Sequence, residues 1–361
     1  MNQILCSLNK KIQSATIVND VKPCTLWQNG SFVHISLSSP GCAFRKAGSC
    51  TMCDYGCGKS IPTTQLKEIL DAAFSSAIMP VKELLIGTCG SILDKNEIMP
   101  ELFRAVLDYI KPMRIKTLIF ETHYTTITQD ALRELKSELG SYCEEIVIEM
   151  GLESSDNFVL ANCWNKSINL SQLEETVRLI KGFGFGVVLN VMSGAPFLTP
   201  AQQFNDTLEA VKYAVRIGAD RTDIFPVNIK KNTVIGYLYG IGKYTRPSLW
   251  MLAEILRTIT DDCLGKIEFS WFGDRQKNGV AVDAIPPASC DICSLKLHQL
   301  LEMVMGTFDA KKRRSIIDSF FVGQPRHCNC YATFLDSLSY EDLYCESNVF
   351  SKINELVKEL L

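Results

Sequence analysis

Three cysteines stand close together near the N-terminus, with the spacing Cys42-x7-Cys50-x2-Cys53, and Cys57 follows four residues later. Thiolates bind both zinc and the irons of iron–sulfur clusters. Three thiolates on one short loop can hold three irons of a cubane cluster, which leaves the fourth iron open to a substrate or cofactor. The alternatives are a zinc site, in which Cys57 would be the fourth ligand, and ordinary buried thiols.

A second group of cysteines lies near the C-terminus, as Cys290-x2-Cys293 and Cys328-x-Cys330. Four thiols in two such pairs can close a tetrahedral zinc site or ligate a second 4Fe-4S cluster. The spacing alone does not separate the two. If one thiol of the four points away, a second cluster would again have an open iron, which could bind substrate or transfer sulfur.

Composition sets limits on the class of protein. The chain has 361 residues, 47% hydrophobic content and a net charge of -3, so it can bury a large core and has no overall basic surface. Nucleic-acid binding would need a local patch or a partner protein, and the short basic runs at 230–231 and 311–314 are more typical of solvated faces. Fifteen cysteines, an odd number, fit metal ligands plus buried thiols better than a disulfide framework.

Membrane-spanning segments and signal peptides are recognised in a sequence by their apolar runs. The sequence contains no run of 18 or more apolar residues, and its N-terminus lacks the pattern of a signal peptide. We therefore expect a cytoplasmic protein without membrane association.

Short aliphatic runs alternate with amphipathic stretches from residue 31 to residue 272, a rhythm that is typical of βα units around a parallel sheet. The expected strands are 32–37, 83–87, 117–121, 145–150, 186–192, 222–226 and 267–271. The expected helices between them are 64–76, 97–110, 129–139, 173–183, 201–217 and 248–258. These elements predict an α/β fold, a partial (β/α)6–7 barrel of the TIM type.

The rest of the chain divides around this barrel. Residues 1–30 form an N-terminal segment, and residues 273–361 form a cysteine-containing extension with helices near 298–305, 310–320 and from 348, and a possible second metal site. Reactive groups of such barrels lie on loops after the carboxyl ends of strands. Because the first cysteine loop follows the first expected strand, we expect it at the mouth of the barrel.

The loop with Cys42, Cys50 and Cys53 resembles the cluster loop of the radical S-adenosylmethionine (SAM) superfamily. The usual family spacing is CxxxCxxC, and the longer first gap here resembles the group of the Elongator catalytic subunit. Motifs at 86–94, 120–123, 150–155, 165–166, 189–192, 195–199, 225–228 and 244–250 resemble, in order and separation, the radical SAM subunit of archaeosine synthase and its bacterial relatives. The resemblance spans roughly residues 30–260.

The resemblance implies a 4Fe-4S cluster on these three cysteines, with Cys57 as a spare or pocket thiol. It also implies that a small-residue turn approaches the methionine end of SAM, since glycine has no Cβ to prevent it. The turn residues in question are Gly87, Thr88, Gly90 and Ser91. Without the resemblance, the sequence of this segment indicates an ordinary turn between a strand and a helix.

Three polar residues at or in expected strands complete the candidate cofactor site. Glu121 and Glu153 could accept hydrogen bonds from ribose hydroxyls or from the methionine ammonium, or could cap helices or pair with lysines instead. Asn190 is a polar residue in an apolar strand, so it needs a partner or faces the barrel lumen. His123 is not assigned a role, because a lone histidine is more often structural.

The implied activity is reductive cleavage of SAM to a 5'-deoxyadenosyl radical, which abstracts hydrogen from a substrate such as a modified nucleoside or a small metabolite. An electron donor such as flavodoxin or ferredoxin would be needed. Three alternatives stay open: a tRNA-modifying carbon–nitrogen lyase of the archaeosine type that acts with a partner subunit, a sulfur-inserting enzyme with an auxiliary cluster, and a non-enzymatic zinc or iron–sulfur scaffold.

Overall fold

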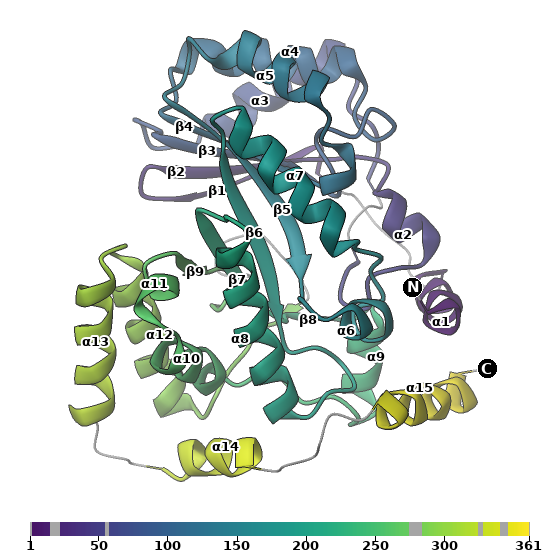
Figure 1. The fold of residues 1–361 in the computed structure, drawn as a ribbon. Coiled ribbons are helices and arrows are strands. Elements are labelled where there is room, and N and C mark those ends of the chain that lie inside the picture. Colours follow the sequence, from purple (N-terminus) through teal and green to yellow (C-terminus); the bar gives the residue numbers. More distant parts are fainter. Residues whose placement is uncertain are drawn as a thin grey trace.

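The computed structural model describes residues 2–14, 22–54, 58–273, 284–323, 328–339 and 346–360. Its centre is an eight-stranded sheet in the spatial order β1-β2-β3-β4-β5-β6-β7-β9. From β2 to β9 neighbouring strands are parallel, whereas β1 at one edge is antiparallel to β2. The sheet curls into part of a barrel, with helices on its outer face (Figure 1). The predicted α/β partial barrel is confirmed.

The strands are β1 Cys24–Asn29, β2 Phe32–Leu37, β3 Glu83–Thr88, β4 Thr117–Thr122, β5 Glu145–Glu153, β6 Gly186–Ser193, β7 Arg221–Pro226 and β9 Ile267–Phe269. All seven expected strands are present, with bounds shifted by up to three residues. Strand β1 was not predicted, because it lies in the N-terminal segment before residue 31. It joins the sheet as the first half of a hairpin, in which Gly30 has a φ of 57° and Asn29 pairs with Phe32.

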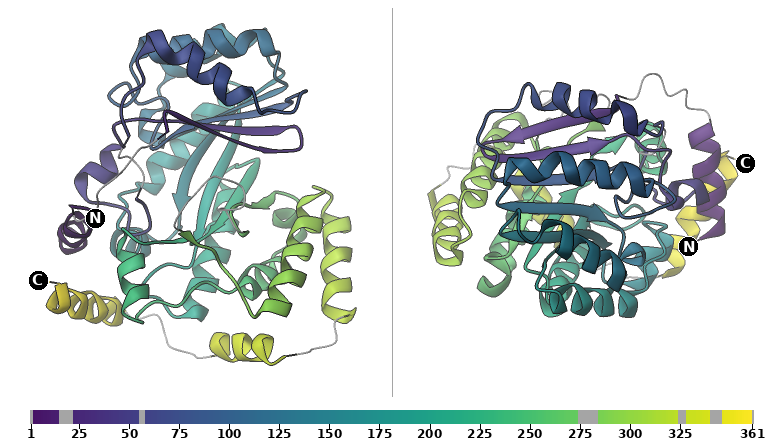
Figure 2. Two further views of the ribbon diagram at one scale, coloured as in Figure 1. Left: turned by 180° about the vertical axis from the view of Figure 1, so that it is seen from behind. Right: turned by 90° about the horizontal axis from the view of Figure 1, so that it is seen from above.

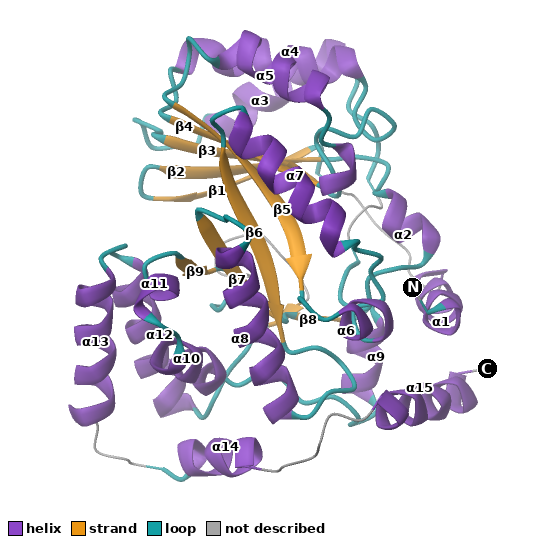
Figure 3. Ribbon diagram, in the orientation of Figure 1, coloured by secondary structure: helices purple, strands orange, loops and turns teal. Residues whose placement is uncertain are grey.

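The helices that follow the strands are α3 Leu66–Phe74, α4 Pro100–Ile110, α5 Gln129–Leu139, α7 Leu170–Gly182, α8 Pro200–Arg216 and α10 Leu249–Thr258. Several of these helices begin at a residue whose side chain caps the N-terminus. The hydroxyl of Thr128 accepts a hydrogen bond from a backbone N–H of α5, and Thr199 forms a capping box with Gln202 at α8. Their apolar faces and one face of the sheet form a single large core. Figure 3 shows these helices along the outer face of the curved sheet.

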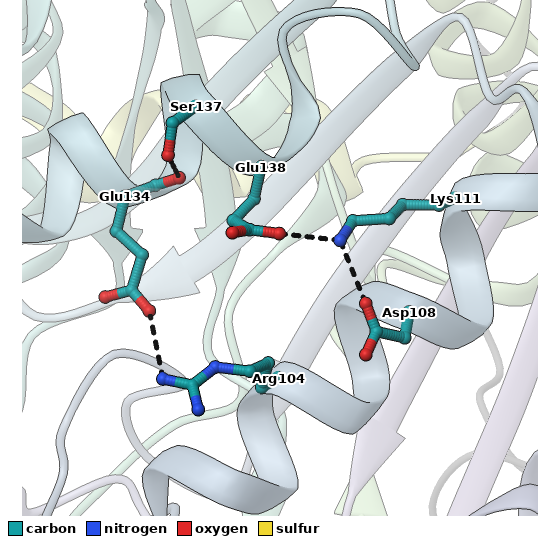
Figure 4. Close-up of polar contacts among 6 residues, drawn as sticks. All are labelled: Arg104, Asp108, Lys111, Glu134, Ser137 and Glu138. Atoms are coloured by element: carbon teal, nitrogen blue, oxygen red, sulfur yellow. Dashed lines mark hydrogen bonds and ion pairs between the residues drawn. The ribbon is translucent and has the colours of Figure 1, made fainter.

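On the outer surface, ion pairs join α4 and the adjoining turn to α5 (Figure 4). Lys111 lies 2.6 Å from Glu138 and 2.9 Å from Asp108, and Arg104 lies 3.9 Å from Glu134. Exposed pairs of this kind each contribute about 0–1 kcal/mol to stability. The buried apolar contacts between these helices and the sheet therefore determine their position.

The extension consists of α12 Asp291–Met305, α13 Ala310–Gly323, α14 Cys330–Ser339 and α15 Glu346–Leu360. Helices α12, α13 and α14 pack near α10, whereas α15 crosses to the other side and contacts α1 Gln3–Ser14 (Figure 2). The helix expected at 298–305 begins earlier, at Asp291. Within the part of the chain that the structure describes, every helix is too short or too polar to span a membrane.

The basic run at 311–314 is solvated in part: Lys311 and Lys312 are exposed, as expected, whereas the two arginines are engaged with the protein. Arg313 is completely buried, and its guanidinium donates to the carbonyl groups of Leu264 and Ile267 at 2.6 and 2.7 Å. Arg314 pairs with Asp261 at 3.0 Å and donates to backbone carbonyls at the end of α10. Both arginines therefore hold α13 against the barrel and offer little charge to a nucleic acid.

Candidate functional site

The first cysteine loop follows β2 at the carboxyl edge of the sheet and is held in place by backbone contacts. Cys42 caps the short helix α2 Ala43–Ala47. Cys50 has a left-handed φ of 62°, which is uncommon for a residue with a side chain and persists where the surroundings impose it. Here its N–H donates to the carbonyl of Asn165 at 3.2 Å, and the N–H of Thr51 donates to the carbonyl of Trp164 at 3.0 Å.

A second support comes from the N-terminal helix. The side-chain amide of Asn9 on α1 donates to the carbonyl groups of Gly48, Ser49 and Cys50 at 3.2, 2.7 and 3.2 Å. Asn9 is completely buried. The loop is thus fixed from two sides, by α1 and by the segment after α6 Asn157–Asn162, and its thiols are held in a defined arrangement.

The three thiols of this loop are close enough to influence one another. Burial raises the pKa of the Cys50 thiol well above its ordinary value, and the nearby Cys53 and Cys42 raise it further. Three thiols on one fixed loop are the ligand set of a cubane cluster with an open iron. Cys57 lies outside the described residues.

The predicted small-residue turn packs directly against this loop. A Cβ added to Gly90 would collide with the Cβ of Cys42 and with the carboxylate of Glu97, so only glycine fits there. Glu97, almost completely buried, accepts from Ser39 at 2.6 Å, from Thr88 at 2.8 Å and from the backbone of Ser91 at 2.9 Å. Sequence reasoning missed Glu97, whose interactions tie the turn to the residues just after β2.

Two of the predicted turn residues use their side chains inside the protein. The hydroxyl of Thr88 donates to Glu97, and that of Ser91 lies 2.5 Å from the hydroxyl of Thr122. Both hydroxyl groups are therefore already hydrogen-bonded within the protein, so a ligand at the turn would interact with its backbone groups. Gly87 lies beside Glu121, because a Cβ on Gly87 would be 2.6 Å from that carboxylate.

Glu153 at the end of β5 forms a buried ion pair with Lys166, at 2.5 Å. The ammonium lies 5.7 Å from the ring centre of Phe44, which is in the first cysteine loop, and it acts electrostatically on Cys50. Burial opposes the charge of Lys166, but the neighbouring Glu153, Cys50 and Cys42 raise its pKa. The sequence places Lys166 in a motif, but its role was not recognised because its partner Glu153 is distant in sequence.

The remaining polar candidates lie on adjacent strands. Burial, followed by the nearby carboxylate of Glu149, raises the pKa of Glu121 to about 8. Asn190 donates to Glu149 at 2.8 Å, so Glu149 joins the site although the sequence did not single it out. His123 packs against Phe44 and Tyr124, and burial lowers its pKa to about 3. It is therefore neutral at physiological pH, in line with a structural role.

The C-terminal cysteines form a compact cage. Their sulfur atoms all lie within 4.8 Å of one another, with separations of 3.2 Å for Cys328 and Cys330, 3.3 Å for Cys293 and Cys328, and 3.5 Å for Cys290 and Cys328. Cys290 caps α12, and Cys330 begins α14. Helix N-termini favour negative charge and hence thiolates. The cage can bind a metal ion.

The barrel contributes to the surroundings of this cage. The indole N–H of Trp250 on α10 donates to the sulfur of Cys330 at 3.2 Å. The Trp250 ring packs against Tyr331, at 4.4 Å between centres, and the hydroxyl of Tyr331 donates to Glu254 at 2.6 Å. A metal in the cage would therefore hold α12 and α14 together against α10.

The chain is similar in sequence to two proteins of the same name. The chain is 28% identical over 246 residues to the archaeosine synthase subunit beta of Methanosarcina acetivorans, covering 67% of this chain and 68% of the relative. It is 24% identical over 243 residues to the subunit of the same name from Thermococcus kodakarensis, covering 63% and 71%. No family model matches.

Among solved structures, archaeal Elp3 from Methanocaldococcus infernus matches with a TM-score of 0.50 and 12% identity, over 76% of this chain and 63% of that one. At this identity the match supports the fold. The chain is thus similar in sequence to proteins named archaeosine synthase subunit beta and similar in fold to Elp3. These similarities support the resemblance of its sequence to the radical SAM superfamily and to the Elp3-like group within it.

Proposed function

We propose that Cys42, Cys50 and Cys53 bind a 4Fe-4S cluster whose fourth iron takes SAM. The observation that carries this proposal is the three-cysteine loop at the carboxyl edge of the sheet, which is fixed by Asn9 and by the backbone at residues 164–165 and which packs against the glycine turn. Bound there, the cluster and SAM would supply a radical able to abstract hydrogen from a substrate. The fixed loop would keep the open iron in one position.

The protein groups around the cluster have separate tasks in this proposal. The turn at Gly87 and Gly90 lets the backbone approach the methionine end of SAM, where a side chain would not fit. Glu121, next to Gly87, remains a candidate for the ribose or ammonium group of SAM. Lys166 provides a buried positive charge beside the cysteines, suited to the methionine carboxylate, while Glu153 keeps it charged and oriented.

Replacement of Lys166 tests this assignment. K166A should weaken SAM binding by about ten- to hundredfold, since one buried charge-assisted contact contributes roughly 1.5–3 kcal/mol. Calorimetric titration of SAM into the protein with its reconstituted cluster measures the effect. K166R keeps the charge and should restore most of the affinity, and the exposed control K212A should bind like the wild type. Unchanged SAM affinity in a folded K166A protein with normal iron content would contradict the role of Lys166.

For the substrate we propose a modified nucleoside or a related small metabolite. Support comes from the relatives named archaeosine synthase subunit beta, which also motivate a tRNA carbon–nitrogen lyase that acts with a partner subunit. A basic partner would supply the tRNA contacts, because this chain carries a net charge of -3 and buries Arg313. Flavodoxin or ferredoxin would supply the electron.

We also propose that the C-terminal cage binds one zinc ion and not a second cluster. Zinc–sulfur bonds of about 2.3 Å in a tetrahedron place the sulfur atoms about 3.8 Å apart. The separations of 3.2 to 3.6 Å here are close to that spacing and much shorter than the roughly 6 Å of a cubane. Zinc lacks redox chemistry, so this assignment argues against sulfur insertion from an auxiliary cluster.

A further inference from the structure

The face of the sheet that is turned away from the helices carries a layer of polar side chains at adjacent positions. Three of these residues, Glu149 on β5, Asn190 on β6 and Asp223 on β7, form what we call the inner-face cluster. Their immediate neighbours along each strand, such as Ile148 and Leu189, belong to the main core beneath the helices. Because successive strand residues face opposite sides, the cluster faces inward. Asn190 and Asp223 are directly paired in the ladder.

The layer lies above an apolar floor. Two residues earlier on the strands, Leu85, Ile119, Val147 and Val188 form a small apolar cluster that is separate from the main core. Residues two apart on a strand share a face, so the inner face changes from apolar to polar toward the carboxyl edge. That edge also carries the first cysteine loop, and the polar layer is therefore on the side of the proposed radical chemistry.

Two oxygen atoms of the inner-face cluster lack hydrogen-bond partners among the described residues. Asn190 donates its N–H to Glu149 at 2.8 Å, and the hydroxyl of Ser270 donates to one oxygen of Asp223 at 2.5 Å. The side-chain oxygen of Asn190 and the second oxygen of Asp223 have no partner, although each residue is only 8% exposed. Buried acceptors without donors are costly, by about 1–3 kcal/mol each. A ligand with N–H donors would satisfy both.

Acidic groups outnumber basic ones around this layer. The charged or titratable groups involved are His34, Glu121, Glu149, Lys166, Arg221, Asp223 and Glu268. The arginine and the lysine already have carboxylate partners, Arg221 with Glu268 at 3.5 Å and Lys166 with Glu153. Burial raises the pKa of Glu149 and that of Asp223. Among the residues named here, the layer therefore has no lysine or arginine without a carboxylate partner.

We propose that Glu149, Asn190 and Asp223 bind a positively charged, N–H-rich group of the substrate, such as an amine, an amidine or a guanidine. The carboxylates would accept charge-assisted hydrogen bonds, and the oxygen of Asn190 would accept another between them. This inference rests on the proposed function in taking the inner face as the substrate side. It names the part of the substrate that the protein selects.

Agmatine, which carries a guanidinium and an ammonium group, is a suitable probe, with N-butylurea as a neutral control. Calorimetric titration into the protein without SAM or reductant should detect agmatine binding and no N-butylurea binding. D223N should weaken agmatine binding at least tenfold, and E149Q should do so as well. The control E175Q changes an exposed acidic residue on α7 and should bind agmatine like the wild type. Thermal denaturation checks that each variant is folded.

The pH dependence provides an independent readout. Burial raises the pKa of Glu149 and that of Asp223, and a bound cation favours their ionised forms, so agmatine affinity should rise with pH and binding should release protons. Titration in buffers of different ionisation enthalpy measures the protons released. A role of these residues in folding alone would give no such release.

Several results would overturn the proposal. These are the absence of agmatine binding to the wild type, equal binding by folded D223N, or a D223N loss that is as large for SAM as for agmatine, which would assign the cluster to the cofactor. Since binding is measured without SAM or reductant, it does not depend on SAM cleavage. A wild-type protein that binds agmatine but fails to cleave SAM would contradict the proposed function and leave this inference standing.

Discussion

Replacing Cys53 by alanine is expected to abolish reductive SAM cleavage, with a fall of at least about a thousandfold in 5'-deoxyadenosine formation. The physical reason is that a cubane cluster on three protein thiolates loses an iron ligand, and the cluster becomes unstable or changes its open site. The loop itself should persist, because its position depends on backbone contacts of Cys50 and Thr51 and on the amide of Asn9. Anaerobic assay with dithionite, with iron measured on the same sample, checks the result.

The matched control is Cys143→Ala. Cys143 is a half-buried thiol outside the site, and its sulfur donates to the carbonyl of Leu139 at 3.4 Å. It should keep the wild-type iron content and activity. Wild-type activity of the Cys53 variant would remove this cysteine from the cluster and return the loop to the scaffold interpretation.

The second large effect is expected from Cys293→Ser. If the C-terminal cage holds zinc, this variant should lose most of its zinc while it keeps its iron, since the two sites use different cysteines. The melting temperature should fall by about 5–10 °C, because structural zinc contributes several kcal/mol to folding. Helices α12 and α14 should loosen first, which hydrogen exchange over 291–305 and 330–339 can measure.

Cys143→Ser serves as the control for oxygen in place of sulfur and should retain both metals. Retention of zinc by the Cys293 variant would contradict the zinc assignment. If the Cys293 variant lost iron and not zinc, the result would favour a second iron–sulfur cluster in the cage. The sulfur-insertion alternative would then be open again.

The parallel part of the fold could be predicted from the sequence because its strands are buried on both sides and separated by amphipathic helices with clear caps. Strand β1 could not be predicted in this way. Trp27 and Gln28 lie in a hairpin at the edge of the sheet, outside the alternation of apolar strands and amphipathic helices. The start of α12 was also missed. Its first turn contains Cys290 and Cys293, whose spacing indicates a metal site and not a helix.

The candidate site was predictable where chemistry and spacing coincide, and less so where partners are far apart in the sequence. Lys166 and Glu153 form an ion pair because the chain turns back toward β5 after α6. Glu97 accepts a hydrogen bond from Ser39, which lies 58 residues earlier in the sequence. Asp223 looks like any acidic residue in a strand until the register places it beside Asn190. The distances between sulfur atoms in the cage depend on packing between residues 293 and 328, which no spacing rule supplies.

The most direct test of the central claim is to purify the protein without oxygen, reconstitute it with iron and sulfide, and measure metal content and SAM cleavage together. The account predicts about four irons and about one zinc per chain, with 5'-deoxyadenosine formed on addition of dithionite. Seven or eight irons would contradict the zinc assignment while leaving the radical site intact. Absence of both iron and cleavage would contradict the account as a whole.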